Sequence, residues 1–229
     1  MKFGVIVFPG SNCDMDIVYV LESIIGQKVT KLWHKDTDLQ ECDFIILPGG
    51  FSFGDYLRSG AIAKFSPIMK EVIGFANSGG YVMGICNGFQ ILTESGLLPG
   101  ALLHNNSHRF ICKNIYLKAE NLNTMVTNKY STIAIKMPIA HAEGRYFADQ
   151  TTLNNIINND QILFKYCDEN GEVSEEINPN GSLMNIAGIC NAERNVFGMM
   201  PHPERAADKQ LGNEDGRLLF ESIINQIKY

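Results

Sequence analysis

Cys86 is the residue of this chain whose surroundings most favour nucleophilic chemistry. It lies in the sequence GICNG (84–88), after a short apolar run and before a segment of helical character. A strand that turns sharply into a helix strains the backbone of its nucleophile, and flanking glycines leave room for that turn. A thiol at the first turn of a helix is also favoured as the thiolate by the helix dipole. We therefore predict that Cys86 is a reactive cysteine in a nucleophile elbow.

A cysteine nucleophile needs a base and a third group that orients the base, and both can be distant in sequence. The segment MPHPE (200–204) offers His202 and Glu204, two positions apart. Each proline favours an extended conformation of the residue before it, so both side chains can project to one side. The segment follows an expected strand, as Cys86 does. We predict a triad of Cys86, His202 and Glu204; the other histidines have weaker motif context, namely His34, His104, His108 and His141.

A glycine pair offers backbone donors for the same site. Gly49 and Gly50 follow the apolar run 44–47, and a backbone N–H near Gly49 to Phe51 could form an oxyanion hole with the N–H of Asn87. Two such donors contribute ~3 kcal/mol each to a developing oxyanion. Gln90, one helical turn past Cys86, is expected to point toward the opening of the same site. An ordinary turn at the glycine pair and a solvated Gln90 are the alternative interpretations.

The elements that must position these residues follow an α/β pattern. In the first half, expected strands at 3–8, 29–33, 44–47 and 81–85 alternate with helices that begin near 14, 67 and 87. Continuous apolar strands of this kind are buried on both faces of a parallel sheet. The pattern predicts a doubly wound, mostly parallel sheet flanked by helices, with reactive groups at the carboxyl ends of its strands.

The second half predicts an antiparallel extension of this sheet. Strand-like runs occur at 111–119, 131–137, 162–167, 186–190 and 196–200, the last two as a hairpin. The Asn-rich run 154–159 is interpreted as a helix end and loop. An amphipathic helix is expected from about Glu214 to Ile227.

Composition limits the classes of function. A length of 229 residues suits one domain, and 25 Asp and Glu against 19 Lys and Arg give no basic field for nucleic acid. No apolar stretch is long enough for a signal sequence or a membrane span, so we expect a cytoplasmic protein. The six cysteines form no C-x-x-C pair, so we expect neither a metal site nor disulfides. Phosphate-binding glycine motifs are absent, so any ATP chemistry is expected on a partner.

Five segments together resemble a known family. They are FPGSNCD (8–14), LPGGFSFGDYLRSGAIA (47–63), GICNGFQIL (84–92), PIAHAEGRY (138–146) and GMMPHPERA (198–206). With them the chain resembles the class I, triad-type glutamine amidotransferases, and most narrowly the small glutaminase subunits of phosphoribosylformylglycinamidine synthases. The resemblance runs nearly end to end and implies one amidotransferase domain over 1–229.

The resemblance also implies roles for individual residues. It implies that Cys86 is the nucleophile, His202 the base and Glu204 the partner of that base. It assigns glutamine binding to the loop at Gly49, Gly50 and Phe51 and to Gln90, with backbone contacts near His141.

A division of labour between subunits is implied as well. Glutamine is hydrolysed here without a cofactor, and the ammonia passes to a large synthetase subunit that assembles with this chain and a small bridging subunit. There, ATP and Mg²⁺ support conversion of formylglycinamide ribonucleotide to formylglycinamidine ribonucleotide in purine biosynthesis. The sequence leaves open a glutaminase subunit of another pathway, a stand-alone hydrolase with a cysteine elbow, and a non-catalytic protein that retains the fold.

Overall fold

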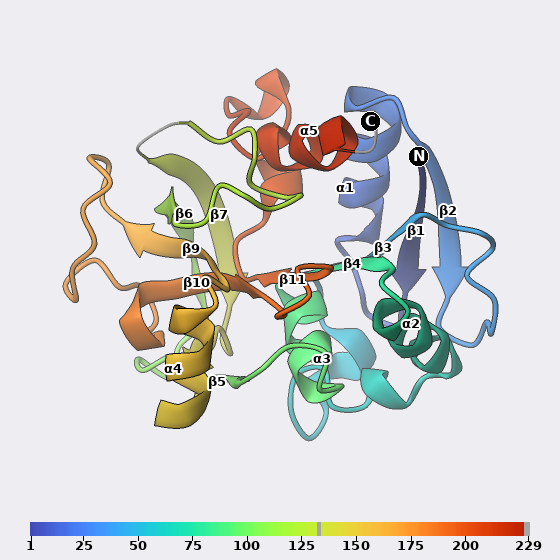
Figure 1. The fold of residues 1–229 in the computed structure, drawn as a ribbon, viewed down its shortest axis with the longest axis horizontal. Helices are drawn as coiled ribbons and strands as arrows, with labels where there is room; N and C mark the ends of the chain where they lie inside the picture. The colour runs from blue at the N-terminus through green and yellow to red at the C-terminus, as the bar shows by residue number, and fades with distance from the viewer. Residues whose placement is uncertain (132–133, 227–229) are drawn as a thin grey trace.

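A mixed sheet runs through the molecule in this computed structural model, which describes residues 1–131 and 134–226. Within these residues the sheet has nine strands in the order β2-β1-β3-β4-β11-β10-β9-β6-β7 (Figure 1). Helices cover both of its faces. The predicted α/β class, with an antiparallel extension, is confirmed.

One half of the sheet is parallel, as predicted. Its strands, in chain order, are β1 (Lys2–Val7), β2 (Lys28–Trp33), β3 (Phe44–Leu47), β4 (Tyr81–Ile85) and β11 (Val196–Met199). All four residues of β3 are buried, because helices cover both faces at the centre of this half. The expected strands therefore agree with the structure to within one residue at each end.

The other half is antiparallel and ends in a proline-containing edge strand. Its members are β6 (Ile111–Ala119), β7 (Ile135–His141), β9 (Ile162–Cys167) and β10 (Ile186–Cys190). The predicted hairpin of β10 and β11 is present. The strand expected at 131–137 was placed too early: β7 continues through Pro138, which an edge strand tolerates, and residues 132 and 133 lie outside the described part of the chain.

Two features escaped the sequence prediction. A separate two-stranded sheet pairs β5 (Ala101–Leu103) with β8 (Arg145–Phe147). The Asn-rich run is a helix end, as predicted, but the helix reaches further than expected: α4 (Gln150–Asn158) includes all of the run except Asn159, and its N-cap Asp149 accepts a hydrogen bond from the Thr152 N–H. A satisfied cap compensates for the low helix propensity of asparagine.

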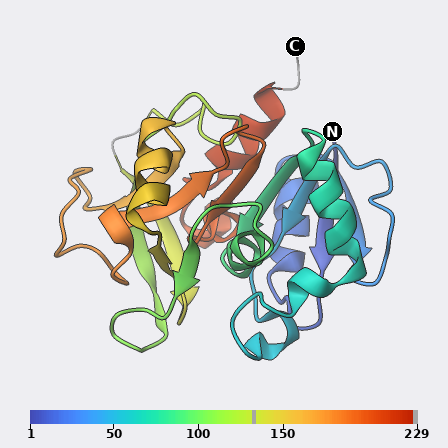
Figure 2. The ribbon, with the colours of Figure 1, turned by 60° about the horizontal axis from the view of Figure 1, so that its bottom comes forward.

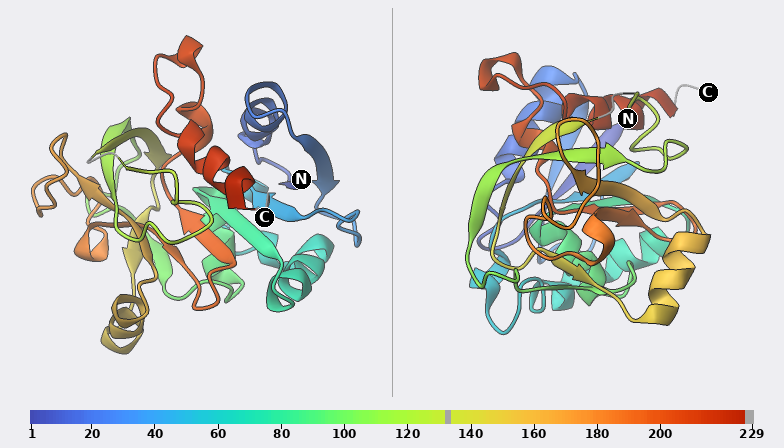
Figure 3. Two further views of the ribbon diagram at one scale, coloured as in Figure 1. Left: turned by 45° about the horizontal axis from the view of Figure 1, so that its top comes forward. Right: turned by 90° about the vertical axis from the view of Figure 1, so that its left-hand side faces the viewer.

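The helices form two layers. On one face lie α1 (Asp14–Tyr19), which continues as a π-helical turn over Val20–Ile24, and α5 (Arg217–Gln226) (Figure 3). On the other face lie α2 (Pro67–Asn77), α3 (Asn87–Glu94) and α4 (Figure 2). The helix expected from about Glu214 to Ile227 begins at Arg217 and is described to Gln226; Ile227 lies outside the described residues. Among the described helices, none combines the length and apolar composition needed to cross a bilayer.

Candidate active site

Cys86 occupies a sharp turn between β4 and α3, as the elbow prediction requires. Its backbone has φ 51° and ψ −105°, a conformation that costs free energy and persists only where the surroundings impose it. A Cβ on Gly84 would lie 2.5 Å from Gly88 C, and one on Gly88 would lie 1.9 Å from Leu47 O. The Cys86 N–H donates to Met199 O at 2.8 Å, which ties the turn to the end of β11. The two glycines therefore allow a close approach that side chains would prevent.

His202 and Glu204 form a hydrogen-bonded pair beyond the end of β11. His202 Nδ1 lies 2.6 Å from Glu204 Oε1, and the two residues are 1 % and 2 % exposed. His202 is extended, with φ −104° and ψ 89°, but Pro203–Arg205 forms a short 3-10 turn rather than an extended chain. The turn, anchored by the His202 N–H donating to Pro138 O at 2.9 Å, brings the carboxylate back to the imidazole.

The second nitrogen of the His202 ring has no oxygen or nitrogen partner within the described residues, and the ring lies against two sulfurs. Nε2 is buried and makes no hydrogen bond within the described residues, and the same holds for Glu204 Oε2. Burial alone lowers the pKa of His202, but the carboxylate of Glu204 and the sulfurs of Cys86 and Cys13 outweigh it and raise this pKa well above 6.5. The imidazole is thus strongly basic, with Nδ1 hydrogen-bonded to Glu204 and no oxygen or nitrogen partner at Nε2 in the described part of the chain.

Gly49 lies where the side chains of Cys86 and His202 come together. A Cβ added to Gly49 would lie 2.8 Å from His202 Cε1, 3.2 Å from Cys13 Sγ and 3.4 Å from Cys86 Cβ. Segments more than a hundred positions apart therefore pack around one glycine. The structure brings together all three predicted triad residues.

The glycine-pair loop beside Cys86 has two available donors. The Phe51 N–H already donates to Gly10 O at 2.9 Å, and Ser52 N–H donates to Asn87 Oδ1 at 3.2 Å. The N–H groups of Gly49 and Gly50, by contrast, have no acceptor within residues 1–131 and 134–226. Gly50 also has φ +134°, which disfavours any side chain there. Of the donors considered at 49–51, those of Gly49 and Gly50 are free to meet an oxyanion, and that of Phe51 is not.

A cavity of about 210 Å³ opens at Cys86. The predicted residues that line it are Gly50, Phe51, Cys86, Gln90 and His141, whereas Gly49, Asn87, His202 and Glu204 lie outside its lining. The Gln90 side chain is 5 % exposed; its Nε2 donates to Glu143 O at 2.5 Å and its Oε1 accepts from Asn87 Nδ2 at 2.9 Å. Gln90 is therefore a fixed wall of the cavity and not a solvated helix residue.

His141 is held as a neutral ring. Its Nδ1 lies 3.0 Å from Asn105 Oδ1, and Asn105 Nδ2 donates to His141 O at 2.9 Å. Burial and the nearby His202 lower the pKa of His141 to about 4. A ring that is hard to protonate and packed against Gly144 shapes the cavity without acting as its base.

Comparison with known proteins agrees with this geometry. Residues 1–216 match the family model of the CobB/CobQ-like glutamine amidotransferase domain. The chain belongs to this amidotransferase family. It is 58 % identical over 226 residues to the phosphoribosylformylglycinamidine synthase subunit PurQ of Moorella thermoacetica (98 % of this chain, 96 % of the relative) and 54 % identical over 228 residues to that of Acaryochloris marina (99 % and 97 %).

Solved structures agree as well. A chain in the structure of PurLQS from Thermotoga maritima superposes with a TM-score of 0.86 at 43 % identity, covering 99 % of both chains. A glutamine amidotransferase from the same organism has a TM-score of 0.54 at 16 % identity, covering 100 % of this chain and 92 % of that one. The second similarity shows a shared fold only.

Sequence reasoning missed several residues of the amidotransferase site. Asp55 and Glu143 line the cavity, and burial raises the pKa of Asp55 to about 6, with a further contribution from Glu143 that a hydrogen bond from Ser59 opposes. Cys13 lies against His202, although the sequence analysis gave it no role. The segments FPGSNCD and PIAHAEGRY, which carry part of the family resemblance, were the available signals for Cys13 and Glu143.

One cluster offers the donor types of a metal site. Ligand atoms of Cys13, His202 and Glu204 all lie within 4.8 Å of one another. However, Arg205 Nη2 donates to Cys13 Sγ at 3.1 Å, and His202 and Glu204 are bonded to each other. A cation at the sulfur and a paired imidazole suit a hydrogen-bonded amidotransferase triad better than a metal centre.

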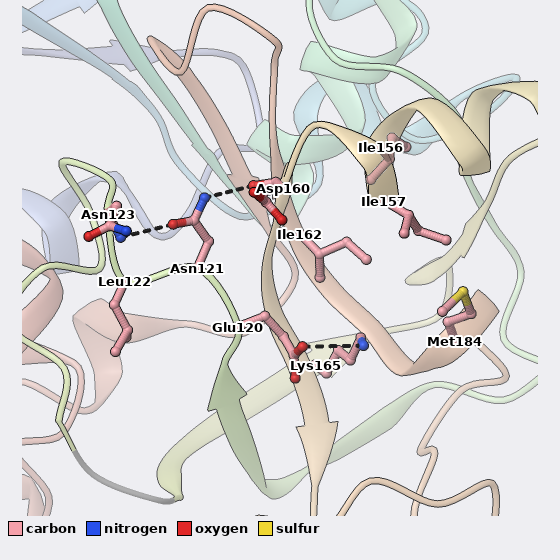
Figure 4. Close-up of a pocket in the computed structure, with 10 residues that line it drawn as sticks. All are labelled: Glu120, Asn121, Leu122, Asn123, Ile156, Ile157, Asp160, Ile162, Lys165 and Met184. Atoms are coloured by element: carbon pink, nitrogen blue, oxygen red, sulfur yellow. Dashed lines mark hydrogen bonds and ion pairs between the residues drawn. The ribbon is translucent and has the colours of Figure 1, made fainter.

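A larger cavity, of about 490 Å³, lies elsewhere, against α4 and β9 (Figure 4). Its polar groups pair with each other: Lys165 Nζ lies 3.4 Å from Glu120 Oε2, and Asn121 Nδ2 donates to Asp160 O at 2.7 Å. The lining includes no cysteine, serine or histidine. Chemistry, and not size, identifies the smaller cavity as the amidotransferase site.

Proposed function

We propose that this chain is the glutaminase subunit of a phosphoribosylformylglycinamidine synthase, acting as one amidotransferase domain over residues 1–229. Cys86 is the nucleophile, His202 the general acid and base, and Glu204 the group that orients His202. One observation carries the proposal: the His202 ring is hydrogen-bonded to Glu204 at Nδ1, has no oxygen or nitrogen partner at Nε2 within the described residues, and lies beside Cys86 in a strained elbow.

The first half of the reaction forms a thioester. The Cys86 thiolate attacks the side-chain carbonyl carbon of glutamine, and the carbonyl oxygen takes up the negative charge. The N–H groups of Gly50 and Asn87 stabilise this oxyanion. His202 gives its proton to the departing nitrogen, the C–N bond breaks, and ammonia and a γ-glutamyl thioester result.

The second half releases glutamate. Ammonia has left, so water reaches the thioester and His202 takes a proton from it. The resulting hydroxide attacks the carbonyl carbon, and the C–S bond breaks to restore the Cys86 thiolate. Gly49, Gly50, Phe51, Asn87 and Gln90 bind glutamine during both halves, with backbone contacts near His141.

The ammonia is used on a partner. In bulk water most ammonia is protonated and no longer nucleophilic, so it passes through a dry passage to a large synthetase subunit. That subunit binds ATP and Mg²⁺ and aminates formylglycinamide ribonucleotide in purine biosynthesis in the cytoplasm; a small bridging subunit completes the complex. The names of the PurQ relatives and the PurLQS structure support this assignment.

Replacement of the nucleophile tests the proposal. In a complex reconstituted with the synthetase subunits, we expect Cys86→Ala to abolish glutamine-dependent amination and to retain amination from ammonium salts. Cys112→Ala, at an exposed cysteine, is the matched control and is expected to keep both activities. Glutamine-dependent activity that survives Cys86→Ala would refute the assignment, as would vigorous glutaminase activity of the isolated wild-type chain.

A further inference from the structure

The segment FPGSNCD (8–14) has no role in the chemistry above, yet it places a second buried sulfur at the site. Cys13 immediately precedes α1, after the carboxyl end of β1, and is 3 % exposed. Its sulfur is among the groups that raise the pKa of His202. A buried thiol against the catalytic base, outside the triad, requires an explanation beyond packing.

Cys13 is fixed from two directions. Its backbone N–H donates to Gly49 O at 3.3 Å, which joins the start of α1 to the loop that supplies the oxyanion donor. Its Sγ accepts a hydrogen bond from Arg205 Nη2 at 3.1 Å. The position that a Gly49 Cβ would occupy is 3.2 Å from this sulfur and 2.8 Å from His202 Cε1. Cys13 therefore contacts both the loop at Gly49 and the turn that carries His202.

Arg205 belongs to the same short turn as the catalytic base. The Arg205 N–H donates to His202 O at 3.2 Å, and the Arg205 side chain reaches back to α1, where Nε lies 3.1 Å from Asp16 Oδ2. Asp16 is three residues after Cys13, on the first turn of α1. The guanidinium thus spans the start of this helix and the histidine turn.

We propose that Cys13, held by Arg205, is a positioning residue. It fixes the positions of the His202 ring and of the Gly49 loop relative to Cys86. This proposal rests on the proposed function and deepens it. The sulfur does not bond to the substrate; it acts by occupying the space beside the imidazole and by accepting the charged hydrogen bond of Arg205. Small displacements of reacting groups are costly, since about 1 Å can lower a rate about 100-fold.

The test compares variants at three positions, two cysteines and one arginine, in the reconstituted complex. Cys13→Ala removes the sulfur, whereas Cys13→Ser retains an acceptor for Arg205. Cys190→Ala removes a fully buried sulfur from the far end of β10 and controls for loss of packing. Arg205→Gln removes the anchor and is assayed in the same way, so the test remains decisive if Cys13→Ala does not fold. Each variant is assayed for glutamine kcat and KM, and ¹⁵N-histidine NMR follows the pKa of His202 in the full chain.

We expect Cys13→Ala to lower the glutamine-dependent kcat about 10- to 100-fold with little change in KM. The pKa of His202 is expected to fall, ammonium-dependent amination to persist, and Cys13→Ser to recover most of the rate. Wild-type kcat in Cys13→Ala, a loss no larger than that in Cys190→Ala, or an unmoved His202 pKa would each overturn the positioning role. If instead wild type itself fails to hydrolyse glutamine in a Cys86-dependent manner, the proposed function fails first, and the two failures are distinguishable.

Discussion

At the scale of single residues, the site concentrates polar groups that the fold does not satisfy. His202 Nε2 and Glu204 Oε2 are buried and have no hydrogen-bond partner within the described chain, and such a group costs about 1–3 kcal/mol. Cys86 adds backbone strain. These costs lie where the reaction needs a free base and a reactive sulfur, so the site favours chemistry at the expense of stability.

The orienting role of Glu204 predicts the effect of removing its charge. In Glu204→Gln the amide retains nearly the same shape, but the carboxylate that raises the pKa of His202 is gone, so this pKa falls. We expect glutamine-dependent kcat to fall about 10³-fold or more, with KM little changed. Steady-state assays across pH measure this, with Glu193→Gln at an exposed position as control. A kcat within about twofold of wild type would show that Glu204 does not orient the base.

The triad was predictable from residue types, and its supporting residues were not. Cysteine between glycines and histidine two positions before glutamate are patterns with a chemical meaning that survives any detail of packing. Cys13 and Asn105 have no such pattern, because their roles arise from contacts with Arg205 and His141. Contacts of this kind depend on how loops from different strands meet.

At the scale of elements, α3 must approach β3 very closely for the elbow to form. Gly88 is the contact point: an added Cβ would lie 1.9 Å from Leu47 O, which is backbone of a central strand and cannot move aside. Gly74 in α2 has nothing within 4 Å of its added Cβ. The two helical glycines therefore differ only in what surrounds them.

This difference predicts opposite outcomes for the same substitution. We expect Gly88→Ala to lower the free energy of unfolding by more than about 3 kcal/mol, because helix and strand must separate. Gly74→Ala should raise it by about 0.5–1 kcal/mol through better helix propensity. Urea unfolding monitored by circular dichroism measures both, and equal stabilities would contradict the close-approach argument.

The elements were predictable where every residue of a strand is buried. They were not predictable where a strand is very short or where a few local contacts stabilise a helix. β3, buried at every residue, was predicted with its observed ends, since a continuous apolar run has no other stable place. The short β5 and β8 escaped because three residues carry too little periodicity. The Asn-rich half of α4 was misjudged because a single cap at Asp149 and two buried residues, Leu153 and Ile156, outweigh weak propensity.

At the scale of the whole molecule, one edge of the sheet gathers the site. The carboxyl ends of β1, β3, β4 and β11 lead into the segments of Cys13, Gly49, Cys86 and His202, so parallel strand order brings four distant segments together. The same convergence buries histidines beside each other. Folding free energy must therefore depend on pH through these rings.

His141 determines the direction in which its own contribution to folding free energy changes with pH. Burial, with the nearby His202, lowers the pKa of His141 to about 4 in the folded chain, against about 6.5 when unfolded. Between these values the unfolded chain binds a proton that the folded chain does not, so acid favours unfolding. From pH 7 to pH 5 this one group removes about 2 kcal/mol of the free energy of unfolding.

We therefore expect the wild-type chain to lose more stability than His141→Gln on acidification from pH 7 to pH 5, as measured by urea unfolding at each pH. His202 acts in the opposite direction: its raised pKa stabilises the folded chain below pH 6.5, and this contribution is lost as pH rises through the folded pKa. The difference between wild type and variant measures His141 together with its coupling to His202, because the two rings influence each other. His108→Gln replaces an exposed histidine and serves as the control variant. Parallel slopes for wild type and His141→Gln would show that His141 accepts a proton in the folded chain as readily as in the unfolded one.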